Sequence, residues 1–182
     1  MTEADRLVWL KLVYQEAKVS GHSWPDYVTA EAALESGFGA SKLSKDGNNL
    51  LGIKQSLKSP RYDTLEMPTK EFINGEFITV MARWIKYPDI QTCFKDRLAI
   101  LKRLASTYPE YMAALTSTNG EAFVKNVSKR WATDPKRAEK VLTIYNRYEF
   151  VFDSNAGNVV PDKSFRDKLK GFFAKLHAYL KN

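Results

Sequence analysis

Cysteine and histidine are scarce in this 182-residue sequence, and their scarcity excludes several kinds of site. Cys93 is the only cysteine, so the chain can form no internal disulfide and no thiolate metal cluster. The two histidines, His22 and His177, form no pair at helical spacing for zinc and make histidine-centred nucleophile systems hard to assemble. We therefore expect no metal and no cofactor, and any catalysis should depend on carboxylates.

A long hydrophobic run is also missing from the start of the chain. Glu3, Asp5, Arg6 and Lys11 interrupt the apolar positions of residues 1–24, which predicts neither a secretion signal nor a membrane span there. A hydrophobic content of 44% over this length suffices for one core, so we expect one main domain. The net charge of +7 favours anionic partners such as nucleic acid, acidic lipid or bacterial wall polymers.

Apolar residues at helical spacing predict a mainly helical chain. The expected helices span residues 3–19 and 25–35, then two helices between Pro88 and Leu115, one helix capped by Asn119 and one capped by Thr133.

One segment, residues 62–83, has the alternating pattern of a β-hairpin. In "KEFINGEFIT" the pair Asn74–Gly75 stands between two β-prone arms, which is a strong signal for a two-residue turn. Such a turn places Phe72 opposite Phe77 on one face. The other face then carries Glu71, Ile73, Glu76 and Ile78.

Glu35 closes the second predicted helix, and the chain beyond it is small, polar and flexible up to Leu50. A carboxylate in the last helical turn lies at the negative end of the helix dipole, and apolar surroundings would penalise its charge further. Both effects favour the protonated form, which can donate a proton to a departing sugar oxygen. Ser36, Gly37 and Gly39 lack bulk, so a polymer could approach closely. Taken alone, a glutamate beside glycine at a helix end is more often an exposed surface residue.

Three motifs occur in the order typical of one enzyme family. "ALESGFGASKLSKDGNNLLGIK" resembles the central motif of glycoside hydrolase family 73, the peptidoglycan N-acetylglucosaminidases, with Phe38 in place of a tryptophan and Leu51 in place of a phenylalanine. "PTKEFINGEF" resembles the family's threonine-x-glutamate-tyrosine hairpin, and "WATDPKRAEKVL" its tyrosine-alanine-threonine-aspartate-proline segment, with Trp131 in place of the tyrosine. The resemblance covers roughly residues 5–150.

The resemblance implies a mainly α (α+β), lysozyme-like fold, in which a helical domain of residues 1–152 and one β-hairpin lobe flank a substrate groove. It implies hydrolysis of the β-1,4 bond between N-acetylglucosamine and N-acetylmuramic acid in peptidoglycan glycan strands. Glu35 would be the general acid and Glu71 the second carboxylate, with Glu66 and Glu76 as rivals for that role. The implied substrate-binding residues are Phe38, Asn49, Lys54, Tyr87 and Trp131.

Several alternatives stay open. Asn49 and Gly52 would otherwise shape the turn that supports Glu35, with Lys54 pairing a nearby acid, and Phe38 and Tyr87 would otherwise be packing residues. The reaction could invert, retain or use the substrate's own acetamido oxygen, since carboxyl separation is a spatial quantity. A lytic transglycosylase or muramidase is the alternative enzyme, and a noncatalytic wall-binding module is the alternative from another class.

The end of the chain lies beyond the resemblance. Residues 153–162 read as a linker and residues 163–182 as a basic amphipathic helix, suited to an anionic membrane, to a partner helix or to packing on the domain. We expect a monomer that binds no nucleic acid. It would act at the bacterial cell wall, as a phage lysin that stays cytoplasmic until release, as a virion-associated enzyme or as a truncated secreted enzyme.

Overall fold

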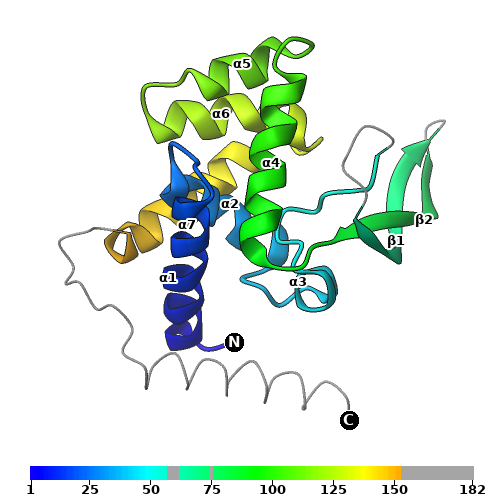
Figure 1. Ribbon diagram of the computed structural model, residues 1–182, viewed down its shortest axis with the longest axis horizontal. Helices are drawn as coiled ribbons and strands as arrows, with labels where there is room; N and C mark the ends of the chain where they lie inside the picture. Colours follow the sequence, from blue (N-terminus) through cyan, green and yellow to red (C-terminus); the bar gives the residue numbers. More distant parts are fainter. Residues whose placement is uncertain (57–61, 74–75, 153–182) are drawn as a thin grey trace. The chain divides into compact units, whose positions relative to one another are not determined.

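Helices make up most of the computed structural model, which describes residues 1–56, 62–73 and 76–152 (Figure 1). This confirms the predicted mainly helical fold with one β-hairpin. In chain order the described elements are α1 (Glu3–Val19), α2 (Pro25–Ser36), α3 (Lys42–Gly47), β1 (Asp63–Ile73), β2 (Glu76–Lys86), α4 (Ile90–Leu104), α5 (Pro109–Leu115), α6 (Gly120–Trp131), α7 (Arg137–Tyr148) and the 3-10 helix η1 (Glu149–Val151).

The helix ends follow from local capping residues. Thr2 and Asp5 form a reciprocal capping box at the start of α1, and Asn119 accepts a hydrogen bond from the backbone N–H of Ala122 at the start of α6. Proline opens α2 and α5, where its missing N–H costs no helical hydrogen bond. The predicted cap at Asn119 is confirmed.

The β-hairpin has the register that the Asn74–Gly75 pair predicts. Phe72 pairs with Phe77 and Ile73 pairs with Glu76 across the antiparallel strands. Strand β2 continues beyond the predicted end at residue 83, because its last residues pair with Asp63, Thr64 and Leu65 of β1. The segment before the hairpin also bonds to this end of β2. Ile85 donates its backbone N–H to the carbonyl of Ile53, at 3.0 Å.

The core lies among the helices, from which the hairpin projects to one side (Figure 1). Helix α2 packs against α1 and α7, while α5 and α6 pack against each other. Their buried apolar side chains supply the hydrophobic stabilisation of this part of the molecule. Fully buried members of the core include Leu10, Val28, Ile85, Phe94, Leu101, Val124, Val127 and Val141.

Two local predictions are wrong. The stretch after Glu35 contains helix α3, which is capped by the side chain of Ser41. Thr133 does not cap α7: that helix starts at Arg137, and the turn before it is held by Asp134 Oδ1, which accepts from the backbone N–H of Lys136 at 2.9 Å.

The predicted linker and basic helix, residues 153–182, lie outside the described residues. No helix in the described part of the chain combines the length and the apolar character needed to cross a membrane.

Candidate active site

Glu35 lies in the last turn of α2, as predicted, and a tight left-handed turn follows it. Gly37, Phe38 and Gly39 have φ values of 59°, 57° and 77°. Ser36 ties this turn to the helix, since its hydroxyl donates to the carbonyl of Ala32 at 2.6 Å and accepts from the backbone N–H of Gly39 at 2.8 Å. The turn therefore holds the chain beyond Glu35 close to the helix end.

The surroundings of Glu35 differ from the apolar ones that we predicted. Arg137, at the start of α7, donates from Nε to Glu35 Oε1 at 2.8 Å. Within the described residues no group donates a hydrogen bond to the second oxygen, Oε2. The Glu35 side chain is 25% exposed, so one end of its carboxyl group is held by a guanidinium and the side chain stays in contact with solvent.

Arg137 belongs to a buried group of charges that we call the charge array: Glu31, Glu35, Arg97 and Arg137. Glu31, one helical turn before Glu35, is 0% exposed. Its Oε1 accepts from Arg137 Nη1 at 3.0 Å, and its Oε2 accepts from Arg97. Arg137 Nη1 also donates to Ser128 of α6, at 2.9 Å. The array thus joins α2, α4 and α7, and its contact with Ser128 adds α6.

Burial and neighbouring charges act on the two arginines in opposite directions. Burial lowers the pKa of Arg97, an effect that Glu31 opposes and Arg137 reinforces. Burial also acts to lower the pKa of Arg137, but Glu31 and Glu35 together raise it above its ordinary value. The array thus combines two acidic and two basic side chains in direct contact.

Trp131, the last residue of α6, is connected to the same array. The guanidinium carbon of Arg97 lies 5.0 Å from the centre of its ring, within the range of a cation–π interaction. Trp131 also lines an open depression of about 1090 Å³ between α6 and the segment leading into α7, together with Ser128, Lys129 and Asp134. Glu35 and the hairpin do not line this depression.

Phe38 lies next to the Glu35 helix end in the chain, but its ring packs inward. Its ring centre is 5.8 Å from that of Trp9 and 5.7 Å from that of Tyr148, both edge-on. The guanidinium carbon of Arg6 lies 4.9 Å from the same ring. These contacts agree with the alternative that Phe38 is a packing residue.

Asn49 and Tyr87 are both almost fully buried at the base of the hairpin. Asn49 donates to the carbonyls of Ile53 and Ile85, at 2.8 and 2.9 Å, and accepts from the N–H of Ile53 at 2.9 Å. Tyr87 donates its hydroxyl to Asp96 at 2.6 Å, and burial, followed by this hydrogen bond, raises the pKa of Tyr87. Asn49 therefore holds the turn of residues 49–53 against β2, and Tyr87 holds the chain just after β2 to α4. The roles of both residues in substrate binding stay predictions.

Lys54 is exposed beside the hairpin. Its Nζ lies 5.0 Å from the ring centre of Trp84, which is its partner in an isolated β-bridge. Lys54 therefore lies in the segment before the hairpin, at the point where that segment pairs with β2.

The candidates for the second carboxylate lie on the hairpin. The backbone of Glu71 lies in β1 opposite Ile78, and its side chain is outside the described part. Glu66 and Glu76 are exposed, opposite Arg83 and Ile73. The role of Glu71 stays a prediction.

Within the described ranges, no group of three or more histidine, cysteine, aspartate or glutamate side chains is placed to hold a metal ion. The arrangement instead offers carboxylate chemistry at Glu35.

Sequence reasoning missed Glu31, Arg97, Arg137 and Ser128. Glu31 carried one signal: it lies four residues before Glu35 and hence on the same helical face. Arg137 lies within the motif "WATDPKRAEKVL", and Arg97 lies outside all three motifs. Neither was singled out, because charged residues are usually exposed.

Comparisons with known proteins identify the family. A family model described as Glucosaminidase, mannosyl-glycoprotein endo-beta-N-acetylglucosaminidase, matches residues 11–150. The autolysin of Enterococcus faecalis (strain ATCC 700802 / V583) is 34% identical over 139 residues, which cover 71% of this chain and 18% of that protein. The exo-glucosaminidase LytG of Bacillus subtilis (strain 168) is 31% identical over 130 residues, 70% of this chain and 45% of that protein. The chain thus spans less than half the length of these curated relatives.

A solved structure agrees with this identification. The catalytic domain of the autolysin Auto from Listeria monocytogenes superimposes with a TM-score of 0.66 at 25% identity, covering 83% of this chain and 88% of that domain. The lysozyme-like fold implied by the motifs is therefore confirmed. The chain belongs to the glucosaminidase family, glycoside hydrolase family 73.

Proposed function

We propose that this chain hydrolyses peptidoglycan at the β-1,4 bond between N-acetylglucosamine and N-acetylmuramic acid, with Glu35 as the general acid. One observation carries the proposal: Glu35 is a partly exposed carboxyl group at the glycine-capped end of α2, bound through a single oxygen. The family supports the same chemistry, since glycoside hydrolases cleave with a pair of carboxyl groups.

Glu35 donates its proton to the glycosidic oxygen as the bond to the anomeric carbon breaks. The carboxylate that remains is held at Oε1 by Arg137, which is already charged and in place. The glycines on either side of Phe38 keep bulk away from this end of the helix, so that a glycan strand can approach.

Glu71 is the proposed second carboxylate, because its strand position matches the glutamate of the family's hairpin motif. It would activate water, attack the anomeric carbon or support attack by the acetamido oxygen of the substrate. Trp131, which is partly exposed, and Lys54, which is exposed, are the proposed sugar contacts. The indole of Trp131 is suited to stacking on a sugar face.

Exchange of Glu35 for glutamine tests the proposal. E35Q keeps the size of the side chain and its acceptor for Arg137 but has no proton to donate, so wall hydrolysis should fall by at least about 10²-fold. The rate is measured as release of soluble fragments from purified peptidoglycan. The matched control is E139Q, which changes an exposed glutamate on α7 and should keep full activity. Wall hydrolysis by E35Q at the rate of the unaltered protein would refute the role of Glu35.

The products of the unaltered protein identify the bond. Mass spectrometry of the digest should find N-acetylglucosamine at the reducing end. Anhydromuramyl products would identify a lytic transglycosylase, and reducing muramic acid a muramidase. A protein that binds the wall and releases no fragments would be a noncatalytic module.

We propose further that the chain acts at the bacterial cell wall as a monomer. Between Asp162 and Asn182 it carries six Lys or Arg against two Asp, a charge suited to an anionic membrane surface or an acidic partner helix. Co-sedimentation of the full chain with anionic vesicles tests the membrane contact. If the chain does not sediment with the vesicles, that contact is excluded.

A further inference from the structure

We infer that Arg137 is a positioning residue for Glu35, and that Glu31 sets the position and the effective charge of Arg137. The inference rests on the proposed function of Glu35 and adds the part of the site that lies behind it. The contacts that carry it are the single hydrogen bond to Glu35 and the buried pairs behind that bond.

The geometry leaves Arg137 little freedom. Its side chain is 2% exposed, and its Nε and Nη1 atoms contact residues on two helices, α2 and α6. A planar guanidinium holds these partners in one fixed geometry, which a flexible ammonium group does not reproduce. The orientation of the Glu35 carboxyl group is thereby determined by residues that are themselves buried.

Stability alone is a poor explanation for this arrangement. Buried ion pairs contribute little net stability compared with apolar residues of similar size. Here the side chains of Glu31, Arg97 and Arg137 are 0%, 0% and 2% exposed. A set of buried charges that ends on the one partly exposed carboxyl group of α2's last turn is better explained by a role at that group.

Glu31 and Arg97 complete the inference. Glu31 uses both oxygens to pair the two arginines, so its charge offsets theirs beside Glu35. Loss of that charge would leave two guanidinium groups facing one carboxylate. Among the described residues, Arg137 from α7 pairs directly with Glu35, and Glu31 from α2 links Arg137 to Arg97 from α4.

Arg137→Lys is the first test, measured with soluble peptidoglycan glycan strands. Lysine keeps the positive charge but cannot span Glu31, Ser128 and Glu35 together, so kcat should fall roughly 10- to 100-fold, with KM within about twofold. Arg147→Lys is the matched control on the same helix, where an exposed arginine pairs with Glu3, and it should leave both constants unchanged. A wild-type kcat for R137K would overturn the inference.

Glu31→Gln is the second test, and it decides the question if R137K does not fold. It removes one buried negative charge, so the alkaline limb of the kcat/KM pH profile should move to lower pH by about one unit. A merely structural residue would change the melting temperature and leave that limb in place, and such a result overturns the inference. The proposed function fails separately, if E35Q retains full activity.

Discussion

At the scale of single residues, the environment of His22 shows how burial determines protonation. The side chain is 6% exposed in the turn between α1 and α2, and its Nε2 lies 3.1 Å from the carbonyl oxygen of Phe94. Burial, reinforced by the positive charge of Arg97, lowers the pKa of His22 to about 3. The folded chain therefore keeps this ring neutral in a pH range where the unfolded chain protonates it.

This difference predicts a stability that rises with pH between about 3 and 6.5. In that window the unfolded state binds one proton more at His22, so the free energy of unfolding should increase by about 1.4 kcal/mol per pH unit from this residue. His22→Gln keeps a donor for the Phe94 carbonyl but does not titrate, so its slope should be lower by that amount. Urea unfolding at several pH values measures both slopes. Parallel curves for the two proteins would show that His22 is not the cause.

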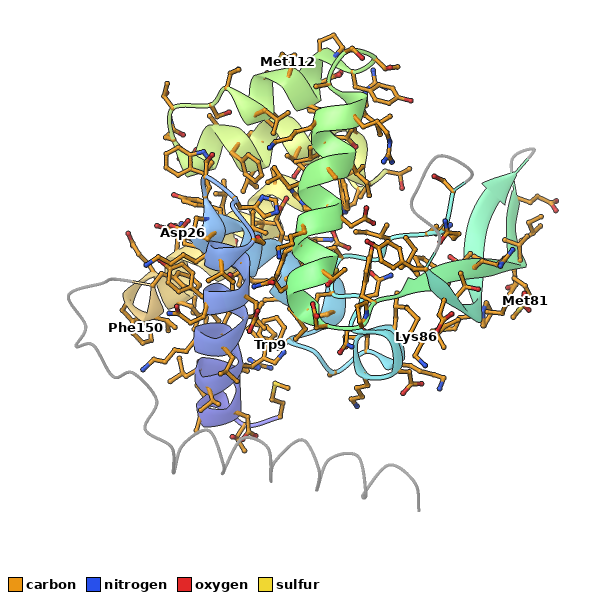
Figure 2. The ribbon with its side chains drawn as sticks, viewed as in Figure 1. Trp9, Asp26, Met81, Lys86, Met112 and Phe150 are labelled. Atoms are coloured by element: carbon orange, nitrogen blue, oxygen red, sulfur yellow. The ribbon has the colours of Figure 1, made fainter. Side chains whose placement is uncertain are left out.

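At the scale of elements, the turn after α2 depends on glycine for two different reasons. Gly37 has a left-handed conformation with open space around its Cα, since an added Cβ would meet nothing within 4 Å. Gly39 has a similar φ, but an added Cβ would lie 2.3 Å from the indole nitrogen of Trp9, the α1 residue labelled in Figure 2. A side chain at Gly37 would therefore meet backbone strain alone, whereas one at Gly39 would meet backbone strain and a steric clash with Trp9.

We therefore predict unequal effects of alanine at these two positions. Gly37→Ala should lower the free energy of unfolding by about 1 kcal/mol through backbone strain alone. Gly39→Ala should lower it by about 2–4 kcal/mol, because the buried Trp9 must also move. Denaturant unfolding measures both changes. Equal losses would show that the indole moves aside at no cost.

Most elements could be predicted because their signals are local. The Asn74–Gly75 pair determines the hairpin register, and proline marks the first residue of α5. Helix α3 was missed because six residues are too few to show a helical period. The start of α7 was misplaced because Asp134, not Thr133, supports the turn before Arg137.

At the scale of the whole molecule, Cys93 reports on the integrity of the core. It is fully buried on α4, and burial raises the pKa of its thiol to about 12, although the backbone near Leu50 and Leu51 opposes this shift. The thiolate, which is the reactive form, is therefore both rare and inaccessible in the folded chain.

Cys93 should not react with a thiol reagent until the chain unfolds. The folded protein at pH 8 should show no labelling over the time in which the denatured protein labels completely. Thr118→Cys adds an exposed cysteine, and that variant should label at one site at once. Complete and rapid labelling of the unaltered folded protein would show that the core opens locally.

The charge array could not be predicted at any scale below the whole molecule. Glu31 contacts Arg97 and Arg137 across sequence separations of 66 and 106 residues. No local pattern relates positions so far apart, and in a single sequence each arginine looks like an exposed residue. The position of Glu35 was accessible from its motif, whereas its partners required the folded chain.

The separation between Glu35 and Arg137, 102 residues, also orders events during synthesis. A ribosome releases the acid-bearing helix and the whole hairpin before α7 exists. The carboxyl group consequently acquires its guanidinium only when the last helix of the domain closes onto the first ones. A chain that ends before residue 137 would have the proposed proton donor without the residue that we infer to position it, so its hydrolysis of peptidoglycan should be slow.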